Sequence, residues 1–162
     1  MKSLITTVLL ATCLAAPALA ALSPNDSAYL TSAMQAQLGR YAMAELEVKS
    51  GSNASLKQLA QDIVATSTAQ TRALDAIAKK NGVPIPTHPN VRDSYHYSQL
   101  MGLRGGALDQ RFVQELQIDD AMIQNNDQSE AQSGQDPALR SFAKKRNLAL
   151  QNEMSRLGKI HV

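Results

Sequence analysis

Cysteine is almost absent from this chain of 162 residues: the only one is Cys13, close to the N-terminus. A chain with a single cysteine forms no internal disulfide bond, so its fold must be stable without one. Tryptophan is absent, and aromatic residues make up only 4% of the sequence. The three histidines lie outside the long helices predicted below, at His88, His96 and His161. Neither thiolate chemistry nor a histidine-rich metal centre in the core is therefore expected.

The first twenty residues have the pattern of a secretory signal peptide. Lys2 precedes an apolar run from Leu4 to Ala16, and the segment ends in Ala18-Leu19-Ala20. This ending predicts cleavage after Ala20, which would also remove Cys13; a lipid anchor on Cys13 is the less favoured alternative. Nothing that follows approaches the ~18 apolar residues of a membrane span. We expect one domain, residues 21–162, that is periplasmic or secreted, with association with the outer membrane left open.

Charge is nearly balanced, with 16 basic and 14 acidic residues. Such a balance gives no reason to expect nucleic acid or an anionic membrane as the partner. The one basic run, Lys144-Lys145-Arg146, falls within a predicted helix. We expect it to form a solvated helix face, and a binding patch is the alternative.

Glycine and proline stand mainly at boundaries between segments with helical periodicity. The predicted long helices run from Pro24 to Ser50, from the Gly51-Ser52-Asn53 break to Asn81, from Ala107 to Ser133, and onward from Asp136-Pro137. Each carries apolar residues three and four positions apart, which places them on one helix face. Residues 83–90, VPIPTHPN, form a Pro-rich crossover, and a short extra helix is predicted at Val91–Leu103. The sequence therefore predicts an all-α, ferritin-like four-helix bundle.

A polar residue interrupts the apolar stripe near the middle of each long helix. These residues are Arg40, Ser67, Asp119 or Asp120, and Asn152 or Glu153. Helical bundles build di-metal centres at this level from about four carboxylates and two histidines, with Glu-x-x-His motifs on paired helices. The chain contains no Glu-x-x-His. We therefore expect no resident metal and no cofactor.

Five stretches, in this order and spacing, resemble a known family. They are SPNDSAYL (23–30), SNASLKQLAQDIV (52–64), Lys-Asn-Gly-Val-x-x-Pro (80–86), LDQRFVQEL (108–116) and SGQDPALRSFA (133–143). The family consists of exported bacterial proteins of unknown function, often labelled as outer-membrane proteins and expected to form ferritin-like four-helix bundles. The resemblance covers essentially the whole chain after residue 20.

The resemblance also implies a metal-binding constellation in the core of family members. Their typical residues are a Glu, two Asp-His pairs and a His, where this chain has Arg40, Thr66-Ser67, Asp119-Asp120 and Asn152. One Asp of that set remains and every His is replaced, so the positions Arg40, Ser67, Asp119, Asp120 and Asn152 form a degenerate site. An unpaired charge in a core is expensive. We predict that Arg40 pairs with Asp120 or Asp119, with hydrogen bonds from Ser67 and Asn152; the alternative is that all of them face solvent.

Three other segments have structural interpretations. In Tyr95-His96-Tyr97 the two tyrosines are expected to pack the short helix onto the bundle and leave His96 exposed; an aromatic ligand-binding corner is the alternative. Val83 and Ile85 are expected to cover one edge of the bundle. Residues 124–136 are polar on every side, which predicts a solvated and frayed helix end.

The functional prediction is a non-catalytic periplasmic bundle that acts as a binding or interaction module. Its partner would be an unknown envelope protein, and a homodimer is left open. The sequence has no Gly-rich phosphate loop, nucleophile elbow or paired catalytic carboxylates, so an enzyme is not expected. The alternative is a ferritin-like metal-binding or redox protein that uses the bundle carboxylates Glu47, Asp119, Asp120 and Glu153.

Overall fold

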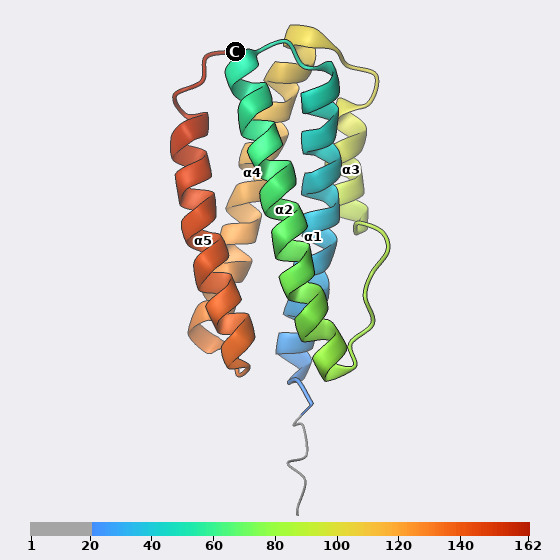
Figure 1. The fold of residues 1–162 in the computed structure, drawn as a ribbon, viewed down its shortest axis with the longest axis vertical. Helices are drawn as coiled ribbons and strands as arrows, with labels where there is room; N and C mark the ends of the chain where they lie inside the picture. The colour runs from blue at the N-terminus through green and yellow to red at the C-terminus, as the bar shows by residue number, and fades with distance from the viewer. Residues whose placement is uncertain (1–20) are drawn as a thin grey trace, which may run out of the picture.

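The computed structural model describes residues 21–162, so the predicted signal peptide and Cys13 lie outside the described residues. Five α-helices follow one another along the chain (Figure 1): α1 (Pro24–Ser50), α2 (Ala54–Asn81), α3 (Val91–Leu100), α4 (Gly105–Ser133) and α5 (Pro137–Leu157). Residues 21–162 contain no β-strand. Within the same residues, no helix combines the length and the apolar character needed to cross a membrane.

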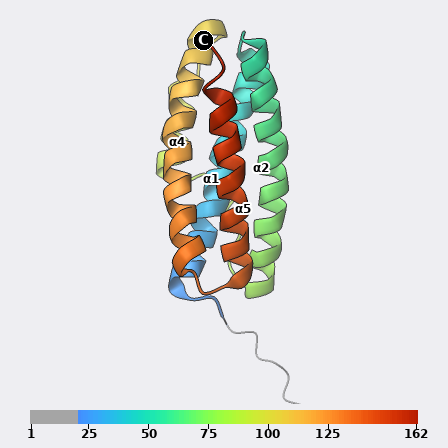
Figure 2. The ribbon, with the colours of Figure 1, turned by 90° about the vertical axis from the view of Figure 1, so that its left-hand side faces the viewer.

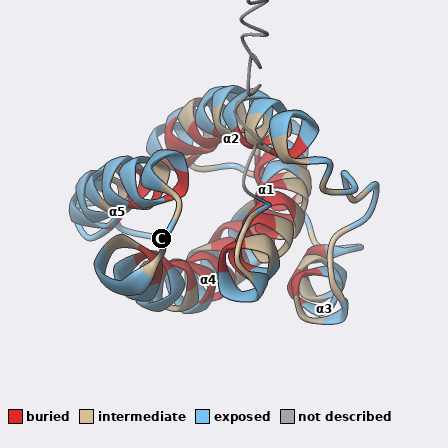
Figure 3. Ribbon diagram, turned by 90° about the horizontal axis from the view of Figure 1, so that it is seen from below, coloured by how far each residue is buried: buried red, intermediate tan, exposed pale blue. Residues whose placement is uncertain are grey.

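Four of the helices form an all-α bundle. The hairpin of α1 and α2 packs against the hairpin of α4 and α5, with α1 next to α4 and α2 next to α5 (Figures 1 and 2). The crossover after α2 runs back along the bundle, so α4 enters from the end at which α1 finishes. Helix α3 lies outside the bundle, against α1 and α4 (Figure 3). The four long helices and the crossover predicted from the sequence are present.

Side-chain caps explain where three of the four long helices begin, namely α1, α2 and α5. The side chains of Ser23, Asn53 and Asp136 each accept a hydrogen bond from the amide three residues further on, at 3.1, 3.0 and 2.9 Å. Such caps satisfy amide groups that lack a partner within the helix. Helix α2 ends at Gly82, whose φ of 66° lies in the left-handed region that favours glycine. The predicted boundaries at these positions are confirmed.

Two predicted boundaries are wrong by a few residues. Helix α4 begins at Gly105 rather than Ala107, and the φ of 55° at Gly105 is one that glycine adopts freely. Helix α3 ends at Leu100 rather than Leu103. Met101 is extended and Gly102 has a φ of 84°, so the chain turns there toward α4.

The apolar core is divided into layers along the bundle. A large cluster around Phe112 fills the end at which α1 finishes, and a second cluster around Leu30 and Leu74 fills the other end. Between them, only a small cluster of Ala36, Ile123 and Leu150 is apolar. The rest of the central layer is therefore left to polar side chains.

The two hairpins repeat the same sequence pattern at a constant offset in residue number. The step from Asp26 to Asp109 equals the step from Glu47 to Glu130. The same step relates Gly51 to Gly134, Asn53 to Asp136, Leu56 to Leu139 and Ala60 to Ala143, and we call it the repeat offset. Since α1 corresponds to α4 and α2 to α5, the bundle has an approximate two-fold relation between its halves.

Candidate functional site

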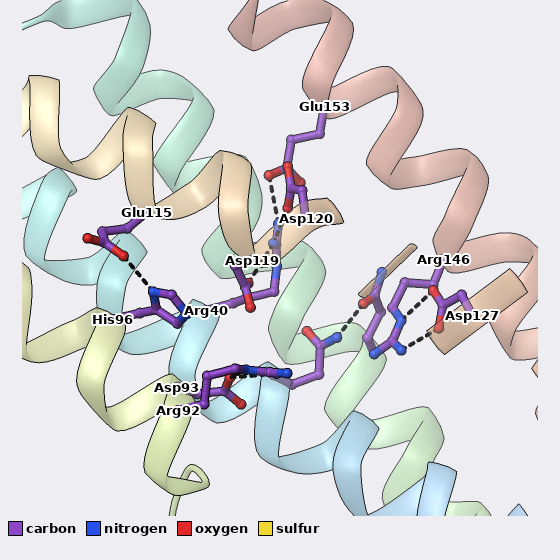
Figure 4. A network of polar contacts seen from close by, with 12 residues as sticks. Arg40, Arg92, Asp93, His96, Glu115, Asp119, Asp120, Asp127, Arg146 and Glu153 are labelled. Carbon is purple, nitrogen blue, oxygen red and sulfur yellow. Dashed lines mark hydrogen bonds and ion pairs between the residues drawn. The ribbon is translucent and has the colours of Figure 1, made fainter. Parts of the chain in front are cut away.

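The centre of the bundle holds a buried arginine surrounded by three carboxylates (Figure 4). Arg40 of α1 is only 4% exposed. Its Nη1 lies 3.1 Å from Oδ2 of Asp119 and also pairs with Oδ1 of Asp120, both on α4. Its Nη2 lies 2.6 Å from Oε1 of Glu153 on α5. The ion pair predicted for Arg40 is therefore present, and it joins three helices.

This cluster has more negative than positive groups. Burial raises the pKa of Asp120 to about 6, against the lowering effect of Arg40 and with a further rise from Glu153. Burial likewise raises the pKa of Asp119. Burial alone would lower the pKa of Arg40, but the surrounding carboxylates outweigh it and raise that pKa. The guanidinium thus stays charged while Asp120 becomes protonated in mildly acidic solution.

Two predicted members of the cluster behave differently from expectation. Ser67 is buried on α2, but within residues 21–162 its side chain makes no hydrogen bond to Arg40. Asn152 is exposed, so its predicted role is wrong. Glu153 takes that place, because it lies three residues after the buried Leu150 and four before the buried Leu157, on the inner face of α5.

The four carboxylates of the alternative metal site do not come together. Asp119, Asp120 and Glu153 converge on Arg40, whereas Glu47 lies seven residues further along α1, about 10 Å at the helical rise. There it faces Asp109. In the described residues, no group of three or more His, Cys, Asp or Glu side chains is arranged to hold a metal ion. The space between the central carboxylates is filled by the guanidinium group.

A second buried network links α1, α4 and α5. Asp127 of α4, fully buried, accepts hydrogen bonds from the Tyr29 hydroxyl at 2.7 Å and from Nε of Arg146 at 2.8 Å. The Arg146 guanidinium also lies 5.2 Å from the ring centroid of Phe142. The prediction that the basic run forms a solvated helix face holds for Lys144 and Lys145, but it is wrong for Arg146, which is buried because it pairs with Asp127.

Residues 124–136 are likewise not polar on every face. Helix α4 continues to Ser133 and buries Asp127 and Glu130 against the other helices. The prediction of a solvated, frayed end is wrong because buried carboxylates and their partners replace apolar residues on the inner face. Composition alone does not reveal this, since the partners lie on other helices.

His96 of α3 is buried, contrary to the prediction that it is exposed. It is 6% exposed, and its Nδ1 lies 2.5 Å from Oε2 of Glu115 on α4. Arg111 lies 2.6 Å from the other oxygen of the same carboxylate. Tyr97 packs against the core as predicted, whereas Tyr95 is largely exposed. The contact between α3 and α4 is therefore made by a polar pair as well as by an aromatic ring.

The crossover covers the bundle edge with one residue instead of two. Val83 packs against the core cluster that contains Leu74, as predicted. Ile85 is exposed, which contradicts the prediction.

The family model of a domain of unknown function, DUF4142, matches residues 11–160 of the sequence. The chain belongs to the DUF4142 family. A crystal structure of a DUF305 fragment from Deinococcus radiodurans is similar to it, with a TM-score of 0.75 and 14% sequence identity over 86% of this chain and 99% of that chain. That likeness shows the helical-bundle fold alone. No curated protein matches the sequence significantly.

The two halves of this DUF4142 domain differ in charge at equivalent core positions. At the repeat offset, the residues of the Arg40 cluster and of the network around Asp127 have uncharged counterparts in the other hairpin. The pairs are Arg40 with Ile123, Asp119 with Ala36, Ser67 with Leu150, Asp127 with Ala44, Arg146 with Ile63 and Tyr29 with Phe112. Ala44, Ile63 and Phe112 share one apolar cluster, and Ala36, Ile123 and Leu150 share another. The counterparts of the ionic residues are thus uncharged and mostly apolar; the exceptions are Gln37 and Gln70, the polar counterparts of Asp120 and Glu153.

Four buried carboxyl groups lie at the ends of the DUF4142 bundle, and only Glu47 among them is predicted as a candidate ligand from the sequence. They are Asp26, Glu47, Asp109 and Glu130, all nearly inaccessible. None lies in a recognisable ligand motif. The signal that finds them is the internal repeat, since the spacing from Asp26 to Glu47 recurs unchanged from Asp109 to Glu130.

Proposed function

We propose that this DUF4142 protein is a non-catalytic, periplasmic helical-bundle protein whose core carries a degenerate ferritin-like metal site. The observation that supports the proposal is the position of Arg40, between Asp119, Asp120 and Glu153 at the centre of the bundle. Ferritin-like bundles hold metal ions at this level, between carboxylates of facing helices. In this protein a guanidinium supplies the positive charge instead and fills the space.

We propose that the protein binds its partner through its outer surface. The charged groups of the core are engaged with one another: Arg40 with three carboxylates, and Arg146 with Asp127. Such a core stabilises and orients helices and leaves recognition to the exterior. The partner in this proposal is another protein of the cell envelope or a second copy of the chain.

The decisive experiment tests whether the guanidinium of Arg40 occupies the place of a bound metal ion. The chain without its first twenty residues is purified without chelator, analysed for metals, and challenged with iron, zinc, copper and manganese while its thermal midpoint is followed. A ligand that binds only the native state must raise that midpoint. We expect the wild-type protein to carry no stoichiometric metal and to show no rise.

The matched variants are Arg40→Ala and Arg72→Ala. Arg40→Ala leaves three carboxylates without their buried cation, which should cost about 3–5 kcal/mol of stability. A divalent cation such as Mn²⁺ should then recover part of that loss. Arg72 is exposed on α2, so Arg72→Ala should behave as the wild type. One metal ion per wild-type chain with a raised midpoint would show that the site is still functional and the proposal wrong.

Compartment and assembly need separate measurements. Fractionation of cells that express the full chain, with N-terminal sequencing of the product, should give a periplasmic protein that begins at Ala21. Sedimentation of the purified protein distinguishes a monomer from a second copy as partner. A product that retains residues 1–20 in the cytoplasm would contradict the proposed location.

A further inference from the structure

Each helical hairpin is closed by an aspartate from the other hairpin. At the end where α1 joins α2, Asp109 of α4 accepts hydrogen bonds from the Ser52 amide at 2.8 Å, the Ser52 hydroxyl at 2.5 Å and the Asn53 amide at 2.9 Å. These amides belong to the turn just before α2. Asp109 therefore holds the α1–α2 turn against the start of α4.

The opposite end of the bundle repeats this arrangement. Asp26 of α1 accepts hydrogen bonds from the Gln135 amide at 2.9 Å and the Asp136 amide at 3.1 Å. These amides form the turn between α4 and α5. Because Gln135 and Asp136 correspond to Ser52 and Asn53 at the repeat offset, the two turns are closed in the same way.

A buried glutamate lies beside each of these aspartates, on the last turn of the preceding helix. Glu47 is 0% exposed, and Glu130 is also buried. An ideal Cβ at Gly51 would overlap Oε1 of Glu47 and would lie 2.8 Å from Oδ1 of Asp109. An ideal Cβ at Gly134 would likewise overlap Oε1 of Glu130. Each glutamate thus folds back under a glycine that leaves room for its carboxyl group.

The glutamates lack a hydrogen-bond donor. Both carboxyl oxygens of Glu47 and Oε1 of Glu130 are buried without a donor within residues 21–162. Their neighbours Asp109 and Asp26 are already occupied as acceptors of the turn amides. Two ionised carboxylates in such a place would repel each other. A proton on the glutamate removes the repulsion and supplies the missing donor.

We propose that Glu47 and Glu130 carry protons that they donate to Asp109 and Asp26, and that these two carboxyl pairs act as latches that hold both ends of the bundle closed in acidic solution and loosen as the pH rises. The latches are independent of the central Arg40 cluster. Their duplication at equivalent positions is the main argument, because each end supplies the same four parts: a glutamate, a glycine, a turn and an aspartate from the other hairpin.

The charges around each pair agree with this assignment. Burial raises the pKa of Glu47 to about 8, helped by Asp109 and opposed by Lys57 of α2. Burial raises the pKa of Glu130 to about 7, helped by Asp26, Asp136 and Asp127.

The partner aspartates shift the other way. Burial alone would raise the pKa of Asp109, but hydrogen bonds from Ser52, Glu47 and Asn53 outweigh it and lower that pKa. The same balance, with hydrogen bonds from the amides of Gln135 and Asp136, lowers the pKa of Asp26.

The direction of the pH effect follows from these shifts. A glutamate in the unfolded chain loses its proton near pH ~4.3. Between that pH and the raised pKa, the folded state binds a proton that the unfolded state does not, so stability falls as the pH rises. Each latch should lower the folding equilibrium constant by about tenfold per pH unit in this range. The pKa of Asp120, about 6, is close to the values of about 8 and 7 for Glu47 and Glu130, so the substitutions, and not the pH range, separate the latches from the central cluster.

The test compares the wild type with Glu47→Gln, Glu130→Gln and the double variant by denaturant unfolding from pH 6.0 to 8.5. Glutamine has the shape of a protonated glutamate and keeps a donor for the aspartate. The control is Glu45→Gln, since Glu45 is exposed on the same helix as Glu47. We expect the wild type and the control to lose stability with rising pH. Each single variant should lose part of that dependence, and the double variant most of it, with the remainder due to Asp119 and Asp120.

Hydrogen exchange at the turns gives a second, local result. After correction for the intrinsic rate, the amides of Ser52, Asn53, Gln135 and Asp136 should lose protection between pH 6 and 8.5 in the wild type but not in the double variant. Equal pH dependence in the wild type and the double variant would overturn the proposal.

A third measurement does not depend on the variants. ¹³C NMR of the wild-type glutamate carboxyl groups follows their titration directly, and it decides the matter if a glutamine variant fails to fold. Two glutamates that titrate near pH 7 to 8 support the latches. Titration of every glutamate close to the ordinary value of about 4.3 refutes them.

Discussion

The core network of Tyr29, Asp127 and Arg146 allows a quantitative test of how this bundle tolerates buried charge. Within residues 21–162, Asp127→Ala removes the only carboxylate that forms an ion pair with Arg146, and it removes the acceptor of the Tyr29 hydroxyl. Breaking a buried ion pair by removing one partner costs about 3–5 kcal/mol. For a domain of this size that corresponds to a fall in the thermal midpoint of roughly 10 °C or more.

The internal repeat supplies the matched control for this experiment. The counterparts of Tyr29, Asp127 and Arg146 are Phe112, Ala44 and Ile63, which pack together in an apolar cluster. The triple variant Tyr29→Phe, Asp127→Ala, Arg146→Ile therefore gives the charged layer the composition of its apolar counterpart. Replacing a buried pair by apolar residues is often neutral or stabilising, although the smaller side chains leave some unfilled volume.

The assay is urea unfolding at pH 7, followed by circular dichroism, for the wild type, Asp127→Ala and the triple variant. We expect the single variant to be the least stable of the three and the triple variant to recover at least half of its loss. A loss below about 1 kcal/mol in Asp127→Ala, far under the cost of an uncompensated buried charge, would mean that Arg146 finds water when unpaired. A triple variant less stable than Asp127→Ala would refute the equivalence of the two layers.

Two further predictions concern glycines that lie against other side chains. Gly39→Ala should destabilise the bundle and loosen α3, because an ideal Cβ at residue 39 would lie 2.8 Å from Cβ of Asp93 on α3. Thermal melts and hydrogen exchange at the α3 amides check this prediction. A variant more stable than the wild type would contradict it. Gly51→Ala should also lower the thermal midpoint, since its Cβ would overlap Oε1 of Glu47. The control is Gly106→Ala in the first turn of α4, where a new Cβ would meet no atom within 4 Å. It should leave stability unchanged or raise it by up to about 1 kcal/mol. Equal losses of stability in Gly51→Ala and Gly106→Ala would show that the overlap with Glu47 does not cause the loss.

Much of the fold could be predicted because its signals are local. Caps at Ser23, Asn53 and Asp136 and the stop at Gly82 depend on a few neighbouring residues, so their positions can be read from the sequence. The ion pair of Arg40 could also be predicted, because a charge in an apolar stripe requires a partner at the same level of the bundle.

The errors arise where the deciding contact is made by another helix. His96 has no partner on its own helix and is buried by Glu115 of α4, and the segment around Asp127 is buried by Arg146 and Tyr29. The assignment of Asn152 could have been avoided, because the spacing from Leu150 to Leu157 selects Glu153 for the inner face. A helix periodicity identifies which face is buried but not which polar residues pair across it.

The unequal charge of the two hairpins has a consequence for assembly. If the α1–α2 hairpin paired with another copy of itself, Arg40 would face Ala36, Gln37 and Gln70, the counterparts of Asp119, Asp120 and Glu153, and would remain buried without a carboxylate. Two α4–α5 hairpins would instead bury Asp119 and Asp120 opposite Ile123, without a cation. The ions therefore discriminate between correct and incorrect pairing of two similar hairpins, as polar core positions do in coiled coils. The unequal charges of the two repeated hairpins thus specify that α1–α2 pairs with α4–α5 and not with a copy of itself.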